Sequence, residues 1–214
     1  MKRTTFAATI LAAGLIPSAR ARAQELSGDE MLARAAASDN LTSYSVPVHF
    51  AVHMRRPLGI RAPVEGIVYY KAPAQAALVL TKVPGPLGGF FKGSYRLDMT
   101  PQTWPGQYKV GSTSAGADGS TYLLHATPKV ADPDVQSVEI TVSQADYEPL
   151  AIRWLYRDGS SIELKMENRR ISGAALPQKQ TIAVTMPKYA LEATATYGDY
   201  ALNVAVPDDV FRSR

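Results

Sequence analysis

The chain has 214 residues and an apolar fraction of 46%, which is typical of a globular protein and argues against a disordered one. It contains no cysteine, which excludes disulfides, a thiolate metal site and a cysteine nucleophile. The chain has 23 basic and 19 acidic residues, but four of the basic residues and none of the acidic ones lie in residues 1–23. Residues 24–214 therefore carry 19 of each and have no net charge. The main argument for nucleic-acid binding, a basic chain, is lost.

The first 23 residues have the pattern of a cleavable secretory signal. Two basic residues precede an apolar run over residues 6–16, and a small-residue site follows at 21–23. The apolar run is too short to span a bilayer as a helix. We therefore expect cleavage after Ala23 and export of a single domain, residues 24–214, to the periplasm in preference to secretion.

One helix is expected near the start of that domain. Ser27 and Glu30 have the spacing of a capping box, and good helix formers follow them. The pattern predicts an amphipathic helix over residues 28–38.

From residue 43 onward the helical period disappears, and apolar residues alternate with polar ones. In the first strand, Val46, Val48, Phe50, Val52 and Met54 share one face. Strands of this kind, separated by Pro, Gly, Asn and Asp, are predicted at 46–54, 66–71, 77–83, 107–112, 121–127, 138–143, in a hairpin at 154–166, and at 181–187, 190–197 and 202–206. Because no helix-length segment separates them, we expect about eleven strands in antiparallel meanders.

The hairpin at residues 154–166 indicates its own register. A two-residue turn would pair Trp154 with Glu163 and mix apolar with polar faces. A three-residue loop, closed by Gly159 in the left-handed conformation, pairs Trp154 with Ile162 instead. We expect the second register, because it gives the sheet one apolar and one polar face.

Residues 83–106 break the alternation. They are rich in Pro and Gly, yet they carry large apolar residues such as Trp104. A loop of this length is uncommon inside a compact domain. Two interpretations stay open: a cover over a cavity, or a short helix that fills ordinary core.

The sequence shows no recognisable catalytic or metal site. His49 and His53 lie on one strand roughly 13 Å apart, too far to share an ion. The Gly-x-Ser-x-Gly nucleophile motif is absent, and the related sequence at 111–116 is predicted to be a loop. The acidic pairs at 132–134 and 208–209 occur in turn-forming sequence. We therefore expect no enzyme, no metal and no cofactor.

Motifs spread over residues 27–211 carry a resemblance to a known family. They are the helix with the long strand after it, GIVYYKAP at 66–73, WLYRDGSSIEL at 154–164, SGAALP at 172–177, MPKYALEATATYGDYALN at 186–203 and VPDDVF at 206–211. Together they resemble the periplasmic lipoprotein carriers of the LolA type and related outer-membrane lipoprotein-sorting proteins. The resemblance implies a mainly β fold: an unclosed antiparallel β-barrel, or half-barrel, wrapped around the N-terminal helix and a short helical or loop lid.

The resemblance also implies a lid and a lid latch. Residues 86–99 correspond to the lid, and we expect Leu87, Phe90 and Phe91 to form its apolar cover. The family's latch arginine stands just before the proline that ends the second strand. Here that position is Ala72, and Lys71 precedes it.

The resemblance implies an apolar cavity that holds an acyl chain and shields it from water during transfer, so the expected function is that of a carrier. The residues expected to line it are Phe50, Val52, Met54, Leu80, Trp154 and Leu164; any one of them would serve equally as ordinary core. The expected partners are a lipid or lipoprotein acyl chain and a membrane-anchored donor or acceptor protein, with no nucleic acid.

Two other functions stay open. One is an envelope-stress or regulatory domain that binds a protein through a sheet edge or through the region of Arg169 and Arg170. The other is an enzyme, such as an esterase, whose site the sequence does not reveal.

Overall fold

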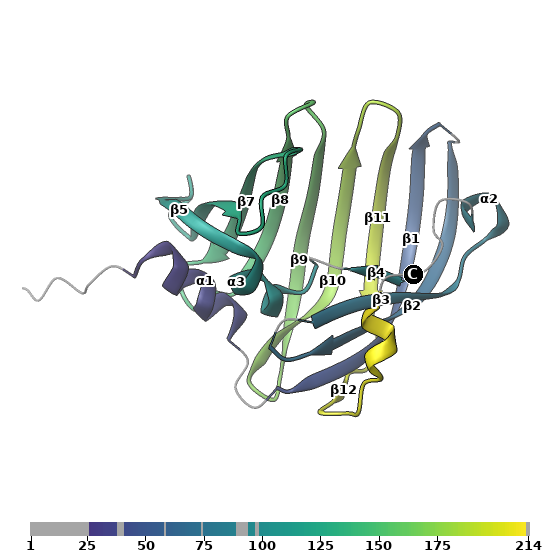
Figure 1. Cartoon of the computed structure of the whole chain (residues 1–214), viewed down its shortest axis with the longest axis horizontal. Helices are drawn as coiled ribbons and strands as arrows, with labels where there is room; N and C mark the ends of the chain where they lie inside the picture. Colours follow the sequence, from purple (N-terminus) through teal and green to yellow (C-terminus); the bar gives the residue numbers. More distant parts are fainter. Residues whose placement is uncertain are drawn as a thin grey trace, which may run out of the picture.

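One antiparallel sheet bends around two small helical elements (Figure 1). The computed structural model describes residues 26–37, 41–57, 59–73, 75–88, 94–96 and 99–212, and the structural statements below concern these residues. The strands are β1 (Ser43–Arg56), β2 (Ile60–Lys71), β3 (Gln75–Lys82), β4 (Ser94–Arg96), β5 (Tyr108–Ala115), β6 (Thr121–Pro128), β7 (Val135–Ser143), β8 (Pro149–Tyr156), β9 (Ser161–Ile171), β10 (Ala174–Thr185), β11 (Ala190–Tyr197) and β12 (Ala201–Leu202).

The strand order makes the sheet an open half-barrel. The order is β4-β3-β2-β1-β11-β10-β9-β8-β7-β6-β5, and β12 pairs with β1 outside this path. The two edge strands, β4 and β5, do not pair with each other, so the barrel is unclosed. The predicted architecture is confirmed, with twelve strands in place of about eleven.

The helical elements are short. They are α1 (Gly28–Ala36), α2 (Gly85–Gly88), the 3₁₀ turn η1 (Pro101–Thr103), α3 (Trp104–Gln107) and the 3₁₀ turn η2 (Asp208–Phe211). Of these, α1 and α3 pack on the concave side of the sheet. None of the helices in the described ranges is long and apolar enough to cross a membrane.

The predicted capping box begins α1. The backbone N–H of Glu30 donates to Ser27 Oγ at 3.3 Å, and the backbone N–H of Ser27 donates to Glu30 Oε2 at 2.7 Å. The hydrogen bond from the Ser27 backbone holds the pKa of the Glu30 carboxyl below its usual range. The helix ends at Ala36, and its buried residues Met31, Leu32 and Ala35 face the sheet.

The hairpin between β8 and β9 has the predicted register. Trp154 pairs with Ile162 and Ile152 with Leu164, and Gly159 has a φ of +82°. The apolar face of this hairpin is covered by α1 and α3, because its buried residues belong to the same cluster as Leu32 of α1 and Trp104 of α3.

Two predicted segments are wrong. Residues 111–116, predicted to be a loop, lie mostly in β5. Residues 111–115 are glycine, serine, threonine and alanine and are exposed at a sheet edge, so no apolar alternation marks them as a strand. The strand predicted at 202–206 is only Ala201–Leu202, because Asn203 has a φ of +53° and its side-chain oxygen accepts a hydrogen bond from the Thr42 backbone.

The core consists of two clusters on the concave face. One joins β1, β2 and the lower parts of β10 and β11, and it includes Tyr44, Phe50 and Tyr197. The other joins α1 and α3 to β5 through β9, and it includes Trp104 and Ile152. Met99 and Ile182 contact both clusters, so they lie where the two meet.

Candidate functional site

The sheet register identifies an apolar band across the concave face, because directly paired residues point to the same side. One row of paired residues, from β2 to β7, contains Ile60, Met54, Leu191, Val184, Ile162, Trp154 and Val138. The next row contains Ala62, Val52, Ala193, Ile182, Leu164, Ile152 and Ile140. Every member of both rows is apolar.

Half of this band is ordinary core. Over β7 and β8, and at Leu164 on β9, it is covered by α1 and by residues 99–107, which run through η1 and α3. Trp104 is 0% exposed, and Ile140 and Ile152 beneath the cover are also fully buried. Residues 99–107 therefore match the second interpretation of the irregular segment, a short helical element that fills the core.

The rest of the band is not fully covered. Ile162, Ile182, Val184 and Leu191 are only partly buried although they lie in the centre of the sheet, on β9, β10 and β11. We call these four residues the apolar window. Three of them lie one residue from the end of their strand, at the end of the sheet that carries the β8–β9 and β10–β11 turns (Figure 1).

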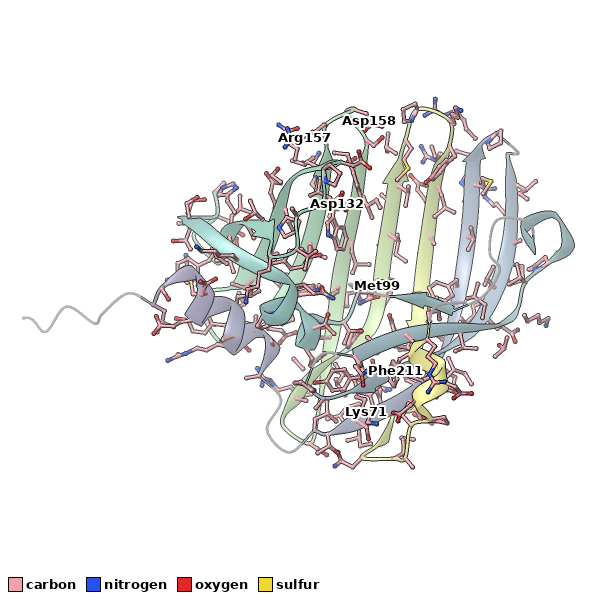
Figure 2. All side chains as sticks on the ribbon, in the orientation of Figure 1. Lys71, Met99, Asp132, Arg157, Asp158 and Phe211 are labelled. Carbon is pink, nitrogen blue, oxygen red and sulfur yellow. The ribbon has the colours of Figure 1, made fainter. Side chains whose placement is uncertain are left out.

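Two hydrogen bonds hold residues 99–107, which we call the filler segment, beside the window. Gln180 on β10 is 0% exposed; its Nε2 donates to the backbone oxygen of Met99 at 3.2 Å, and its Oε1 accepts from the Tyr197 hydroxyl at 2.6 Å. The hydroxyl groups of Tyr44 and Thr100 share a second hydrogen bond. Met99 lies in the middle of the concave face (Figure 2). These bonds fix Met99 and Thr100, the first residues of the filler segment, against β10 and β1.

Aromatic rings close the other end of the half-barrel. Tyr44 stacks on Tyr70 with ring centroids 5.2 Å apart and meets Tyr200 edge to face at 5.2 Å, and Tyr200 stacks on Tyr197 at 6.3 Å. Burial raises the pKa of Tyr44, Tyr197 and Tyr200 above the ordinary value of 10.0. We call these four residues the tyrosine cluster.

The residues predicted to line a cavity lie on the concave face but in different clusters. Phe50, Val52, Met54 and the partly buried Leu80 belong to the first cluster, and Trp154 and Leu164 to the second. Trp154 also donates its Nε1–H to the Tyr108 hydroxyl at 2.9 Å. That these six residues contact a ligand stays a prediction.

Sequence reasoning did not single out the apolar window. Its residues lie in predicted strands and show the right alternation, but nothing local distinguishes them from the covered residues of the same rows. Their partial exposure depends on where α1 and residues 99–107 stop.

The predicted lid is only partly within the described structure. Leu87 lies in α2, but its side chain, Phe90 and Phe91 lie outside the described part of the molecule. Lys71, next to the substituted latch position, pairs its Nζ with Asp208 Oδ1 at 2.6 Å. It therefore joins the end of β2 to η2 (Figure 2).

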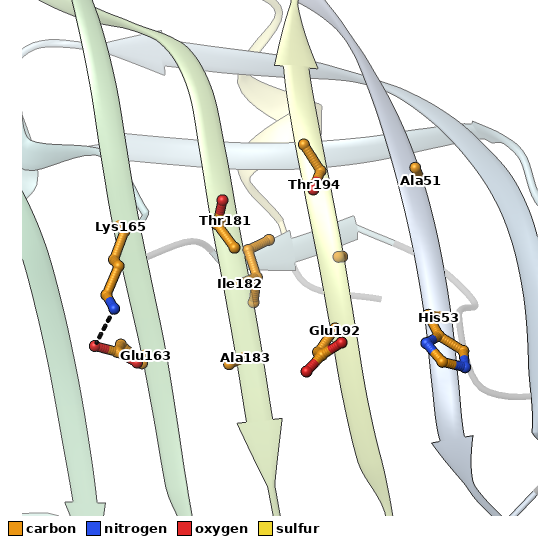
Figure 3. A pocket seen from close by; sticks show the side chains of 10 residues that line it. Ala51, His53, Glu163, Lys165, Thr181, Ile182, Ala183, Glu192 and Thr194 are labelled. Atoms are coloured by element: carbon orange, nitrogen blue, oxygen red, sulfur yellow. Dashed lines mark ion pairs between the residues drawn. The ribbon is translucent and has the colours of Figure 1, made fainter.

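The convex face is polar. A hollow of about 340 Å³ lies over β1, β9, β10 and β11, and charged and small polar side chains such as Lys165, Glu163 and Thr181 line it (Figure 3). Lys165 pairs with Glu163 at 3.3 Å. Within the described ranges, no three His, Asp or Glu side chains are placed to hold a metal ion.

The region of Arg169 and Arg170 is engaged by the chain itself. Arg169 donates to the backbone oxygen of Gly198 and lies over the Tyr200 ring at 5.5 Å, and Arg170 pairs with Asp146 at 2.6 Å. Arg170 stays exposed beside Asp146, so that a protein partner binds in this region remains a prediction.

Replacing Gln180 by leucine is expected to lower the free energy of unfolding by about 2–4 kcal/mol, because it leaves the Tyr197 hydroxyl and the Met99 carbonyl buried without their partner. Denaturant unfolding measures this loss. Gln178→Leu, at an exposed position of the same strand, is the control and should change stability by less than about 0.5 kcal/mol. Equal effects of the two changes would contradict the tethering role.

Comparison with known proteins identifies the fold. No protein-family model and no curated protein matches the chain. A LolA superfamily protein from Nitrosomonas europaea is 15% identical, with a TM-score of 0.62 over 87% of this chain and 98% of that one. A DUF1329 family protein from Desulfovibrio piger is 12% identical, with a TM-score of 0.62 over 86% and 95%. A domain described as an outer membrane lipoprotein-sorting protein, from Vibrio parahaemolyticus, is 9% identical, with a TM-score of 0.58 over 86% and 94%. The chain therefore has the LolA-like fold that its motifs predict.

Proposed function

We propose that the protein is a periplasmic, non-enzymatic carrier that holds an acyl chain or lipid, including that of a lipoprotein, against the apolar window. The observation that carries this proposal is the partial exposure of Ile162, Ile182, Val184 and Leu191 in the centre of a sheet. Central strands normally bury such residues, because leaving an aliphatic side chain in water costs about 1.5–3 kcal/mol. A ligand that covers them recovers part of this free energy.

The dimensions suit a hydrocarbon chain. From Ile162 on β9 to Leu191 on β11, the partly exposed part of the row crosses two inter-strand spacings, or about 10 Å, because Met54, the next residue in the row, is buried. A window of this size contacts part of an acyl chain, since one leaflet of a bilayer holds its tails within about 15 Å, half of the hydrocarbon thickness. Each CH₂ removed from water contributes about 0.8 kcal/mol, so a chain lying along this row is held without a covalent step.

The periplasmic location in this proposal is supported by a predicted secretory signal. The predicted signal at residues 1–23 lies outside the described residues, and the LolA-like fold is shared with a lipoprotein-sorting domain. A periplasmic carrier protects a lipid chain from water between two membranes.

Native mass spectrometry of the protein purified from the cell envelope tests the proposal. We expect a co-purifying species whose mass, after extraction, is that of a lipid or an acylated peptide. Protein free of any lipid would contradict the carrier function, and a defined protein partner in place of lipid would favour the regulatory alternative.

The lid prediction has its own test. Phe90→Asp together with Phe91→Asp is expected to abolish lipid retention while the sheet stays folded, because a charged lid cannot cover an apolar chain. Lipid content is measured after purification, and circular dichroism reports the fold. Unchanged lipid content would contradict the assignment of Leu87, Phe90 and Phe91 to a lid.

A further inference from the structure

A hollow of about 400 Å³ continues the apolar window at the end of the sheet. It is lined by Asp134, Tyr156, Arg157, Asp158, Ser160 and Met186. The backbone N–H of Tyr156 donates to Ser160 O at 3.0 Å, so the β8–β9 pairing extends to Ser160, two residues before Ile162. Met186 likewise donates its N–H to Tyr189 O at 2.9 Å and lies two residues after Val184. Because alternate residues of a strand share a face, the window opens into this hollow, which we call the mouth.

The other end of the window is closed. Beyond Ile182, the next residue of β10 on this face is Gln180, which is 0% exposed and bonded to Met99 and Tyr197. An amphiphile bound on the window can therefore place its polar end only in the mouth. Two residues of a strand separate the window from the mouth, which is a distance of about 7 Å.

The chain itself holds the walls of the mouth in place. The backbone N–H of Arg157 donates to Asp134 O at 3.0 Å, and its Nε donates to Pro133 O at 2.9 Å. The backbone N–H of Ser160 donates to Asp158 Oδ1 at 2.8 Å, and this bond holds the pKa of the Asp158 carboxyl below its usual range. Arg157 and Asp158 lie at the β8–β9 turn (Figure 2). The mouth is thus formed before a ligand arrives, with the Asp158 carboxylate ionised.

Unused hydrogen-bond acceptors are concentrated in the mouth. Neither Asp134 nor Asp158 forms an ion pair within the described ranges. Ser160 is 4% exposed, and its hydroxyl lies beside the Asp158 carboxylate, yet no described group meets this hydroxyl with the geometry of a hydrogen bond. An unmade hydrogen bond in a buried group is costly. At the wall of a hollow, such a group marks a place where a ligand donates.

Basic groups also border the mouth, so its net charge does not select the ligand. Arg157 lines it, the exposed Lys188 follows in the β10–β11 turn, and Arg56 Nη2 donates to the Met186 backbone oxygen at 3.5 Å. The hydrogen-bond inventory is more specific than the charge. Two carboxylates and a hydroxyl oxygen require donors, and a primary ammonium group has three N–H donors and no acceptor. Its hydrogen bonds to carboxylates are strengthened by charge.

We propose that the mouth binds the polar end of the carried amphiphile and selects one that has a primary ammonium group. The ammonium donates to Asp134, Asp158 and Ser160, and the acyl chain runs from the mouth over the apolar window. This inference rests on the proposed carrier function. A primary ammonium occurs in the phosphoethanolamine headgroup of a phospholipid and as the free α-amino group of an acylated peptide, so each source has its own arm in the test.

Displacement of a dansyl-labelled fatty acid from the exported protein, freed of co-purifying lipid, measures the preference. Phosphatidylethanolamine and phosphatidylcholine with the same short acyl chains carry the same phosphate and the same net charge, but only the first has N–H donors. We expect phosphatidylethanolamine to bind at least about tenfold more tightly, the effect of one hydrogen bond between charged groups. A diacylated peptide with a free α-amino group, compared with the same peptide trimethylated at that group, tests the second source.

The outcomes separate this inference from the carrier function. A preference for the primary ammonium in either pair supports the proposal. Equal binding within both pairs overturns it and leaves the carrier function standing, because the acyl chains still displace the fatty acid. A protein that binds neither the fatty acid nor any of the lipids contradicts the carrier function, and the proposal with it.

Variants locate the selecting residues. Asp158→Asn keeps an acceptor for the Ser160 backbone but loses the charge, and should reduce the preference about fivefold or more; Ser160→Ala should reduce it about threefold. Binding of phosphatidylcholine should change less than about twofold in both. Asp118→Asn is the matched control, because Asp118 Oδ1 accepts from the Ser120 backbone N–H at 3.0 Å in the same kind of turn at the opposite end of the sheet. Thermal unfolding shows that each variant is folded. A preference that survives both mouth variants, or that Asp118→Asn reduces equally, overturns the proposal.

Discussion

Ile162→Asp together with Leu191→Asp is expected to reduce lipid retention at least about 100-fold. The two positions lie in the apolar window on either side of Val184, so the new carboxylates face any chain that covers the window. A covering hydrocarbon would have to remove both charges from water, which costs more than the lost apolar contact alone. Because both side chains are partly exposed already, the carboxylates can stay hydrated in the free protein and the sheet should remain folded. Lipid extraction and mass spectrometry, normalised to protein, give the loss.

The control for this pair lies on the other face of the same sheet. Thr181→Asp together with Thr196→Asp places two carboxylates on the exposed convex face, where Thr181 pairs with Lys165 and Thr196 with Lys179. This variant should retain lipid. If the concave pair retains lipid as well, the window is not the binding site.

Raising the pH above about 10 is expected to unfold the protein through the tyrosine cluster. Burial raises the pKa of Tyr44 and Tyr197 above 10.0, so in this pH range the unfolded chain loses protons that the folded chain keeps. The unfolded state then binds fewer protons, and the free energy of unfolding falls as the pH rises, by about 1.4 kcal/mol per pH unit for each such tyrosine. Below pH 10 both states are protonated and this contribution is constant.

Denaturant unfolding at a series of pH values measures this slope, and tyrosinate absorbance shows when the cluster ionises. The cluster should ionise only as the protein unfolds. Tyr44→Phe removes one ionising group and should reduce the slope by about 1.4 kcal/mol per pH unit. A stability that does not change above pH 10 would contradict the burial of these hydroxyl groups.

Local sequence was sufficient to predict the faces of the strands and the register of the β8–β9 hairpin. Successive side chains in a strand point to opposite sides, so alternation alone assigns Val46 through Met54 to the apolar face. Gly159 selects the loop, and the loop sets the pairing of Trp154 with Ile162. The capping box at Ser27 is equally local, because it depends only on Ser27 and Glu30, so the sequence is sufficient to predict it.

Long-range packing alone selects which part of the apolar face stays uncovered. The filler segment is held by contacts between residues far apart in the chain, such as Met99 with Gln180 and Thr100 with Tyr44, and no periodic pattern encodes them. The same limit explains the edge strand β5, whose polar residues have no alternation, and the pairing of Lys71 with Asp208. Alternation depends on neighbours along the chain, whereas the exposure of a side chain depends on what packs above it. In this half-barrel, exposure determines where the candidate site lies.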